Sequence, residues 1–184
     1  EIRSKMKVKI FQSCVLIPSL ISIIIVSYLA YAFLSGRTGF INGSLAAAGK
    51  DTISFYTEPK YWPAILIFIN CWKGAGYSSI IYLAAILGID QEMYEAAEID
   101  GATRWNKIRF ITLPMLKSTV ITLTLMNVGR IFYSDFGLFY QVPMNSGALI
   151  NATNTIDTYV YRGLIELGDI SMSSAACVYQ SLVG

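Results

Sequence analysis

Residues 90–114 read DQEMYEAAEIDGATRWNKIRFITLP, a charged segment that separates two long apolar stretches. Asp90 is a good N-cap for a short helix, and Gly101 is suited to end that helix in the left-handed conformation. Thr103 can cap a second short helix, and Pro114 suits the first turn of the apolar helix that follows because it lacks an N–H. The segment is therefore predicted to form a helical hairpin between two membrane spans.

The apolar stretches outside the hairpin are long enough to cross a bilayer, for which about 20 residues suffice. No charged residue occurs between Ile10 and Gly36, although Pro18 is expected to kink or break that helix. Spanning helices are predicted at about residues 11–34, 61–88, 114–134 and 171–184, with polar loops at 36–60 and 135–169. The predicted fold class is an all-α, polytopic integral membrane helical bundle. Because the chain starts at Glu1 and stops inside an apolar run, we expect one transmembrane domain over residues 1–184 that is truncated at both ends.

The composition excludes several function classes. The 184-residue chain is 54% hydrophobic and 14% charged, whereas soluble domains carry about 25% charged residues. Histidine is absent, which removes histidine-based acid–base and metal chemistry, and we predict neither a metal nor a cofactor. The net charge of +2 gives no electrostatic footprint for nucleic acid. No nucleophile–base set for a membrane-embedded enzyme is apparent, so we expect a non-catalytic membrane protein.

Lysine and arginine residues set the expected orientation, because they are enriched in short cytoplasmic segments. Eight lie in the N-terminal segment or within residues 90–117, and four lie in the loops on the opposite side. The N-terminus and the loop 90–113 are therefore predicted to be cytoplasmic.

The hairpin resembles the EAA motif of binding-protein-dependent ABC importer permeases, the MetI-like family. That motif has Glu-Ala-Ala, three residues, Gly, nine residues and then Ile-x-Leu-Pro. Every position that it specifies matches in this chain, at Glu95, Ala96, Ala97, Gly101, Ile111, Leu113 and Pro114. Residues 72–85, 135–143 and 156–161 also look like parts of the carbohydrate and oligosaccharide permeases of that family.

The resemblance implies a transmembrane permease subunit of an ATP-driven importer, for a sugar or an oligosaccharide, in a bacterial cell membrane. In that family the hairpin is a coupling helix, which sits in a cleft of the cytoplasmic ATPase subunit and passes on the motion driven by ATP. The implied partners are the ABC ATPase subunits, a second permease subunit and an extracytoplasmic solute-binding protein. The alternative is an ion-coupled secondary transporter in which Lys73 and Asp135 are the coupling groups.

Charged residues inside the spans are candidates for the translocation pathway. Lys73 lies near the middle of its span, where it either faces the pathway or has a structural role. The structural alternatives are capping of helix carbonyls near Gly74 and Gly76, where the helix is expected to be bent or tightly packed, and pairing with Asp135. Arg130 and Asp135 lie near the outer end, where they are pathway groups, a structural pair or side chains that snorkel to the interface. The aromatic run 131–140 either stacks on sugar rings or forms an interfacial belt.

Overall fold

The computed structural model describes residues 5–183, with side chains from residue 10 onward. The described residues form helices and turns, without a strand, and the predicted all-α class is confirmed. The α-helices are α1 (Lys5–Leu20), α2 (Ile23–Leu34), α3 (Phe40–Ala47), α4 (Trp62–Leu87), α5 (Gln91–Ile99), α6 (Arg104–Lys107), α7 (Leu113–Val128), α8 (Ile150–Thr153), α9 (Ile156–Ile165) and α10 (Ile170–Val183). Short helical segments of other types are η1 (Pro59–Tyr61), η2 (Ile108–Thr112), η3 (Gly137–Gln141) and η4 (Gly147–Leu149).

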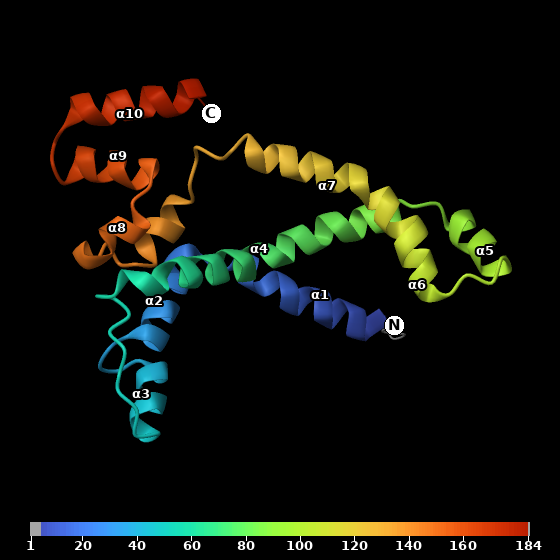
Figure 1. The fold of residues 1–184 in the computed structure, drawn as a ribbon, viewed down its shortest axis with the longest axis horizontal. Helices are drawn as coiled ribbons and strands as arrows, with labels where there is room; N and C mark the ends of the chain where they lie inside the picture. Colours follow the sequence, from blue (N-terminus) through green and yellow to red (C-terminus); the bar gives the residue numbers. More distant parts are fainter. Residues whose placement is uncertain (1–4, 184) are drawn as a thin grey trace.

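The long helix α4 runs through the centre of the molecule (Figure 1). α1 packs along α4, and α7 contacts it as well. α5 and α6 lie at one end of α4, whereas α2, α3, α8 and α9 gather at the other end (Figure 1). The hairpin 90–113 and the cluster of α2, α3, α8 and α9 therefore lie at opposite ends of α4.

Two helical segments are long and apolar enough to cross a membrane, Pro59–Leu87 and Arg104–Val128. The helices of the first apolar stretch pass the same test only as a pair, because Ile10–Leu20 and Ile23–Leu34 meet at an angle of 93°. The described residues therefore contain up to three spans, one of them sharply bent.

The break expected in the helix predicted over residues 11–34 is present, but it lies at Ile21 and Ser22 and divides the stretch into α1 and α2. Pro18 lies inside α1, and its missing N–H and its ring weaken the last turn of that helix. Ser22 then caps α2 by accepting a hydrogen bond from the Ile24 N–H at 3.4 Å. The break therefore follows the proline instead of coinciding with it.

Both segments predicted as loops contain helices. α3 lies within 36–60, and η3, η4, α8 and α9 lie within 135–169. Polar side chains in these segments act as helix caps, as Thr155 does for α9, so their polarity did not distinguish a loop from short helices. The third apolar helix covers Arg104–Val128 instead of 114–134, since the helical run begins before Pro114. α4 and α10 lie where helices were predicted at 61–88 and 171–184, although Gly184 is outside the described residues.

The hydrophobic core lies where α2, α4, η3 and η4 meet. Its buried residues are Val26, Trp62, Leu66, Ile69, Leu138, Val142 and Leu149. Trp62 is fully buried and donates its indole N–H to the Phe55 carbonyl at 2.7 Å. This core anchors the end of α4 that is opposite the hairpin.

α1 packs closely against the middle of α4 at Gly76. A Cβ atom at Gly76 would lie 2.4 Å from the backbone oxygen of Val15, whereas a Cβ atom at Gly74 would have no neighbour within 4 Å. α4 is a continuous helix through both glycines. Of the two predicted alternatives, bending and tight packing, the structure therefore shows tight packing, and at Gly76 alone.

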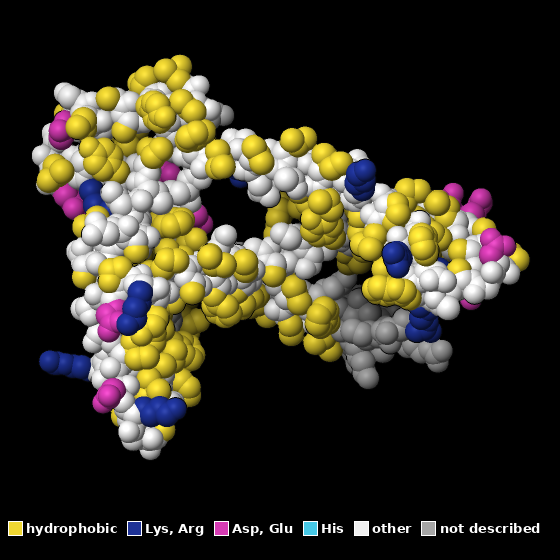
Figure 2. All heavy atoms as spheres, in the orientation of Figure 1, with side chains coloured by type: hydrophobic (Ala, Val, Ile, Leu, Met, Phe, Trp, Pro, Cys, Tyr) yellow, Lys and Arg dark blue, Asp and Glu magenta, His cyan; other side chains and the backbone are white. Residues whose placement is uncertain are grey.

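Many large apolar side chains outside the core are exposed. No residue of the Arg104–Val128 segment is buried. Figure 2 shows apolar side chains along α4 and α7. A helix that is apolar on every side is typical of a membrane span or a protein core. Lipid or other protein chains are therefore expected to cover these faces.

Candidate functional site

The first helix of the hairpin, α5, has the caps that the sequence predicts. Asp90 Oδ1 accepts a hydrogen bond from the Glu92 N–H at 3.0 Å, and the Glu92 carboxylate lies in the first turn, where the helix dipole favours a negative charge. Gly101 follows the helix with φ of +74°, and its N–H donates to the Glu98 carbonyl at 3.1 Å. The predicted N-cap and the predicted left-handed glycine are therefore confirmed.

The second helix of the hairpin continues into the membrane span without a break. Thr103 Oγ1 caps it, as predicted, by accepting a hydrogen bond from the Asn106 N–H at 3.3 Å. A five-residue π-helix, η2, then leads into α7, in which Leu113 donates its N–H to the Ile108 carbonyl. Pro114 lies in the first turn of α7, as predicted, but α7 extends the preceding helix. Because Pro114 has no N–H, the wider hydrogen-bond spacing of a π-helix accommodates it here.

The residues of the EAA motif fall in two places on this hairpin. Four lie in α5 or in the turn after it (Glu95, Ala96, Ala97, Gly101), and three lie at the junction of η2 and α7 (Ile111, Leu113, Pro114). Glu95 and Ala96 are exposed, and Ala97 is half-buried. α5 therefore presents a carboxylate beside two very small side chains, which allow a partner to approach closely.

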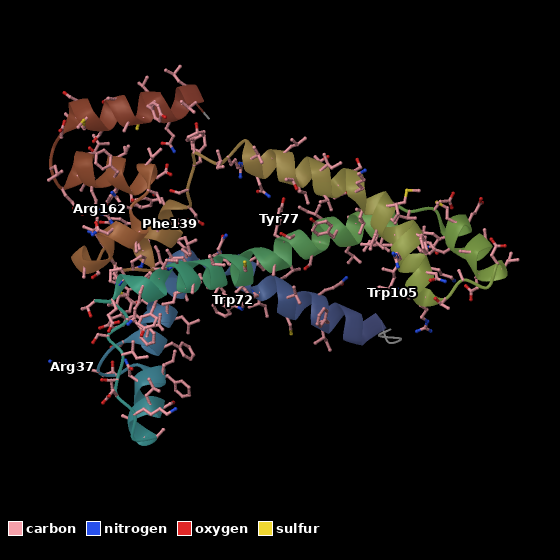
Figure 3. All side chains as sticks on the ribbon, in the orientation of Figure 1. Arg37, Trp72, Tyr77, Trp105, Phe139 and Arg162 are labelled. Atoms are coloured by element: carbon pink, nitrogen blue, oxygen red, sulfur yellow. The ribbon has the colours of Figure 1, made fainter. Side chains whose placement is uncertain are left out.

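Exposed apolar residues accompany this surface. Ile99 is 87% exposed and Trp105 is 66% exposed, and Figure 3 shows Trp105 at the hairpin end of the molecule. Figure 2 shows acidic and basic side chains around the same end. An exposed apolar patch with a charged rim is typical of a protein interaction site.

An ion pair links the two halves of the hairpin. Lys107 Nζ lies 2.8 Å from Glu98 Oε2. The hydrogen bond and the charge of Lys107 hold the pKa of Glu98 below its usual value. Because the Glu98 side chain is exposed, water and salt screen this pair, and its contribution to stability is small.

A polar hollow lies beyond the other end of α7, beside α4. It has a volume of about 510 Å³ and is lined by Arg130, Tyr133, Ser134 and Asp135. An adjoining hollow of about 460 Å³ shares the last three of these residues and adds Asn70 of α4. Figure 2 shows an opening between α4 and α7 at this place. Two of the predicted pathway residues, Arg130 and Asp135, are therefore brought together here.

Neither of the ion pairs predicted for Asp135, with Arg130 or with Lys73, is formed in the described part of the chain. Asp135 Oδ1 instead accepts a hydrogen bond from the Leu138 N–H at 3.1 Å, at the start of η3. Both structural pairings were therefore wrong. The alternative of an ion-coupled transporter, which relied on Lys73 and Asp135, gains no support from these contacts.

Lys73 holds the bend in the first apolar stretch. Its Nζ donates to the Ser19 carbonyl at 3.3 Å, and Ser19 lies in the last turn of α1, where carbonyls lack helical partners. Such a carbonyl needs a partner inside a membrane, because lipid chains cannot supply a hydrogen bond. Lys73 therefore caps a broken helix, but that helix is α1, and not the region of Gly74 and Gly76.

Replacing Lys73 by methionine is expected to destabilise the protein by about 1.5 kcal/mol, because a hydrogen bond from a charged donor contributes about 1.5–3 kcal/mol. Methionine keeps the apolar stem and removes the donor. The thermal unfolding midpoint of the detergent-solubilised protein measures the effect. Lys50→Met, at an exposed lysine in the turn after α3, is the control and is expected to leave the midpoint unchanged. An unchanged midpoint in Lys73→Met would contradict the capping role.

A polar cluster that sequence reasoning missed fastens α9 and α10 to the chain beside the hollow. Asp157 Oδ2 accepts hydrogen bonds from the Ser134 N–H and hydroxyl at 2.7 and 2.6 Å. The Gln180 amide donates to Asp157 Oδ1 at 3.1 Å and to the Phe132 carbonyl at 2.8 Å. Burial alone would raise the pKa of Asp157, but the hydrogen bonds from Ser134 and Gln180 outweigh it and hold that pKa below its usual value. In the sequence, the only feature that points to Asp157 is its place in the first turn of a helix, where an acidic residue is favoured by the helix dipole.

Two aromatic residues of the 131–140 run, Phe136 and Tyr140, pack against each other. Phe136 stacks on Tyr140 with the ring centroids 4.9 Å apart, and Tyr161 of α9 contacts both rings. The guanidinium of Arg162, a residue of α9 that is labelled in Figure 3, is 5.7 Å from the centroid of the Tyr140 ring. These rings form a small core between η3 and α9, whereas Tyr133 is exposed on the hollow.

Comparison with known proteins places this geometry in a family. The family model described as "Binding-protein-dependent transport system inner membrane component" matches residues 4–136. The polygalacturonan/rhamnogalacturonan transport system permease protein YteP of Bacillus subtilis (strain 168) is 34% identical over 189 residues, which cover 100% of this chain and 57% of YteP. The lactose transport system permease protein LacF of Rhizobium radiobacter is 33% identical over 157 residues, which cover 83% of this chain and 51% of LacF. The chain thus spans about half the length of these curated relatives.

A solved structure has the same fold. It is the crystal structure of a bacterial alginate ABC transporter in complex with an alginate pentasaccharide-bound periplasmic protein. One chain of it matches with a TM-score of 0.89 and 37% sequence identity, over 100% of this chain and 63% of that chain. The family model covers most of the present chain, and the whole of the present chain aligns with part of YteP at 34% identity. The chain therefore belongs to the family of binding-protein-dependent transport system inner membrane components.

Proposed function

We propose that this chain is part of a permease subunit of an ATP-driven importer for a sugar or an oligosaccharide. The observation that carries the proposal is the hairpin. Its first helix is capped, with Glu95 and Ala96 exposed and Ala97 half-buried, and its second helix runs without a break into the span that ends at Val128. A short exposed helix with small side chains suits docking into a cleft of another protein, and the helical run connects it to the membrane.

The proposed mechanism is mechanical, and the chain itself carries out no chemistry. Cytoplasmic ATPase subunits that close on ATP would carry α5 with them. Because the hairpin is continuous with α7, this motion would tilt α7 relative to α4 and open the pathway alternately to the two sides. ATP then biases a two-state element of the permease from a distant site, as allosteric coupling requires.

The exposed apolar faces support the proposed assembly in the bacterial inner membrane. A second permease subunit and lipid would cover the exposed sides of α7, which has no buried residue. In this proposal the N-terminus and the hairpin are cytoplasmic, and a solute-binding protein delivers the substrate from the outside. The periplasmic protein bound in the alginate transporter structure supports that last partner.

The similar proteins support a carbohydrate substrate, because their names give polygalacturonan and rhamnogalacturonan, lactose and alginate. We propose that Arg130 and Asp135 line the translocation pathway, since both lie on the polar hollow. Lys73 follows Asn70 by about one helical turn on α4, but it lines neither hollow, and its hydrogen bond to the end of α1 holds the bend instead. The hollows also hold the hydroxyl of Ser134 and the amide of Asn70, which can form hydrogen bonds with the hydroxyl groups of a sugar.

Crosslinking in the assembled transporter tests the proposal. The exposed cysteines Cys14, Cys71 and Cys177 are first replaced by serine. A cysteine in place of Ala97 is then expected to crosslink to the ATPase subunit, whereas a control cysteine in place of Lys50, on the opposite side, is not. Uptake into proteoliposomes is expected to require ATP. The absence of an Ala97→Cys crosslink, or uptake driven by an ion gradient alone, would contradict the proposed function.

The same cysteine-free protein tests the pathway. A cysteine in place of Arg130 is expected to react with a water-soluble thiol reagent in at least one nucleotide state, because Arg130 is exposed on the hollow. Protection of this cysteine in every nucleotide state would contradict a pathway role.

A further inference from the structure

The helical run Arg104–Val128 contains one segment of different geometry, the π-helix Ile108–Thr112. It lies where the hairpin meets the span and ends two residues before Pro114. A π-helical segment inside an α-helix is often found at functional sites and bends. This junction is therefore the place where motion of the hairpin is either passed to α7 or lost.

Among the side-chain contacts of α5 with the run, one reaches Lys107, just before the π-helix, and another reaches Thr112, its last residue. The first is the ion pair Glu98–Lys107, in which the Glu98 side chain is 78% exposed. The second is the hydrogen bond between the Tyr94 hydroxyl and Thr112 Oγ1, at 2.8 Å between two half-buried residues. An exposed ion pair contributes little, so the hydroxyl pair is the firmer of these two connections.

The position of Thr112 makes this hydrogen bond important. Thr112 is the last residue of the π-helix, and its hydroxyl also donates to the Lys107 carbonyl at 3.5 Å. Either hydroxyl can donate in the Tyr94–Thr112 pair, and the 2.8 Å hydrogen bond forms in both cases. Tyr94 thus holds α5 against the last residue before α7, whereas Lys107 lies before the π-helix.

We propose that Tyr94 and Thr112 are positioning residues for coupling, which transmit the motion of α5 across the π-helix to α7. This inference rests on the proposed function, because it requires an ATPase that moves α5. With the hydrogen bond in place, α5 and the start of α7 move as one body. Without it, α5 moves with the ATPase while the π-helix bends and α7 stays behind.

The experiment follows α7 directly in the complete transporter with its ATPase subunits, and ATP is the probe. Spin labels on cysteines in place of Ile67 of α4 and Val128 of α7, both exposed, report the distance between these helices with and without trapped ATP. In Tyr94→Phe and in Thr112→Val, the equilibrium constant for the ATP-induced displacement is expected to fall about three- to tenfold, the effect of losing one hydrogen bond. ATP hydrolysis and the Ala97→Cys crosslink are expected to persist.

Two matched controls accompany these variants. Thr112→Ser keeps the hydroxyl and is expected to retain the displacement, while Glu98→Gln removes the exposed ion pair and is expected to change it little. Should Thr112→Val fail to assemble, Tyr94→Phe decides, because it removes the same hydrogen bond and leaves the helical run unchanged.

The outcomes separate this inference from the proposed function. If the unmodified transporter shows no ATP-induced displacement, the proposed function fails. If it does and both variants show the same displacement, the inference is overturned and the proposed function stands. Loss of the crosslink together with hydrolysis would show that Tyr94 serves docking, which also overturns the inference.

Discussion

Gly101→Val is expected to reduce sugar uptake by the assembled transporter about tenfold or more, while the subunit still inserts into the membrane. Gly101 has φ of +74°, and a β-branched residue in the left-handed region costs about 1–2 kcal/mol. A cost of 1.4 kcal/mol corresponds to about a tenfold change in an equilibrium constant. No atom lies within 4 Å of a Cβ at this position, so the cost arises from the backbone. The hairpin would relieve it by opening, which takes α5 away from the helical run.

A second glycine provides a matched control for this prediction. Gly49 has φ of +69° and similarly open surroundings, but it follows α3, outside the hairpin. Gly49→Val therefore carries a similar backbone cost and is expected to leave uptake nearly normal. Gly101→Asn is expected to retain most of the uptake, since asparagine tolerates the left-handed region. Uptake is measured per amount of subunit in the membrane, and equal losses in the two valine variants would show that the effect is not specific to the hairpin.

The hairpin could be predicted from sequence because its determinants are local. Asp90 bonds to the Glu92 N–H and Thr103 bonds to the Asn106 N–H, so each cap acts within three residues of itself. The left-handed turn depends on the φ of Gly101 alone. Such features can be recognised from a few consecutive residues. The fixed spacing of the EAA motif is a further feature that the sequence alone shows.

The bent first span could not be predicted in detail because distant contacts determine it. Pro18 indicates that the helix is weakened, but not where the chain turns. Lys73, which caps the end of α1, is 54 residues away from its acceptor Ser19. Gly76, where α4 meets the backbone of α1, is similarly distant. No local pattern shows which lysine or which glycine will lie opposite the break.

α3 was missed for a related reason. Its Asn42 looks like a loop residue, yet it is 1% exposed. Its side-chain amide bonds to the Ser35 carbonyl, and also to both the N–H and the carbonyl of Ile53, at 2.8–3.1 Å. A polar residue that is buried and fully bonded in this way stabilises a helix and its neighbouring turn. The sequence shows its polarity but not its partners.

Gly76→Val is expected to destabilise the subunit by about 3 kcal/mol, the upper end of the usual cost of overpacking a well-packed contact. The Cβ atom would lie 2.4 Å from the Val15 oxygen and 3.1 Å from the Leu16 Cα. Both neighbours are backbone atoms of α1, so no side chain can rotate to make room. α1 must move away from α4 as a whole, and the hydrogen bond from Lys73 to Ser19, about one turn along α4, is then lost as well.

Gly74→Val tests whether this cost comes from the contact or from valine itself. Gly74 lies in the same helix, two positions earlier, with no atom within 4 Å of its Cβ position. Because valine forms helices slightly better than glycine, Gly74→Val is expected to leave stability unchanged or slightly raised. Unfolding of the detergent-solubilised subunit, followed by circular dichroism during titration with a denaturing detergent, measures both variants. Since small residues let membrane helices approach closely, equal stability of the two variants would mean that α1 does not pack against α4 at Gly76.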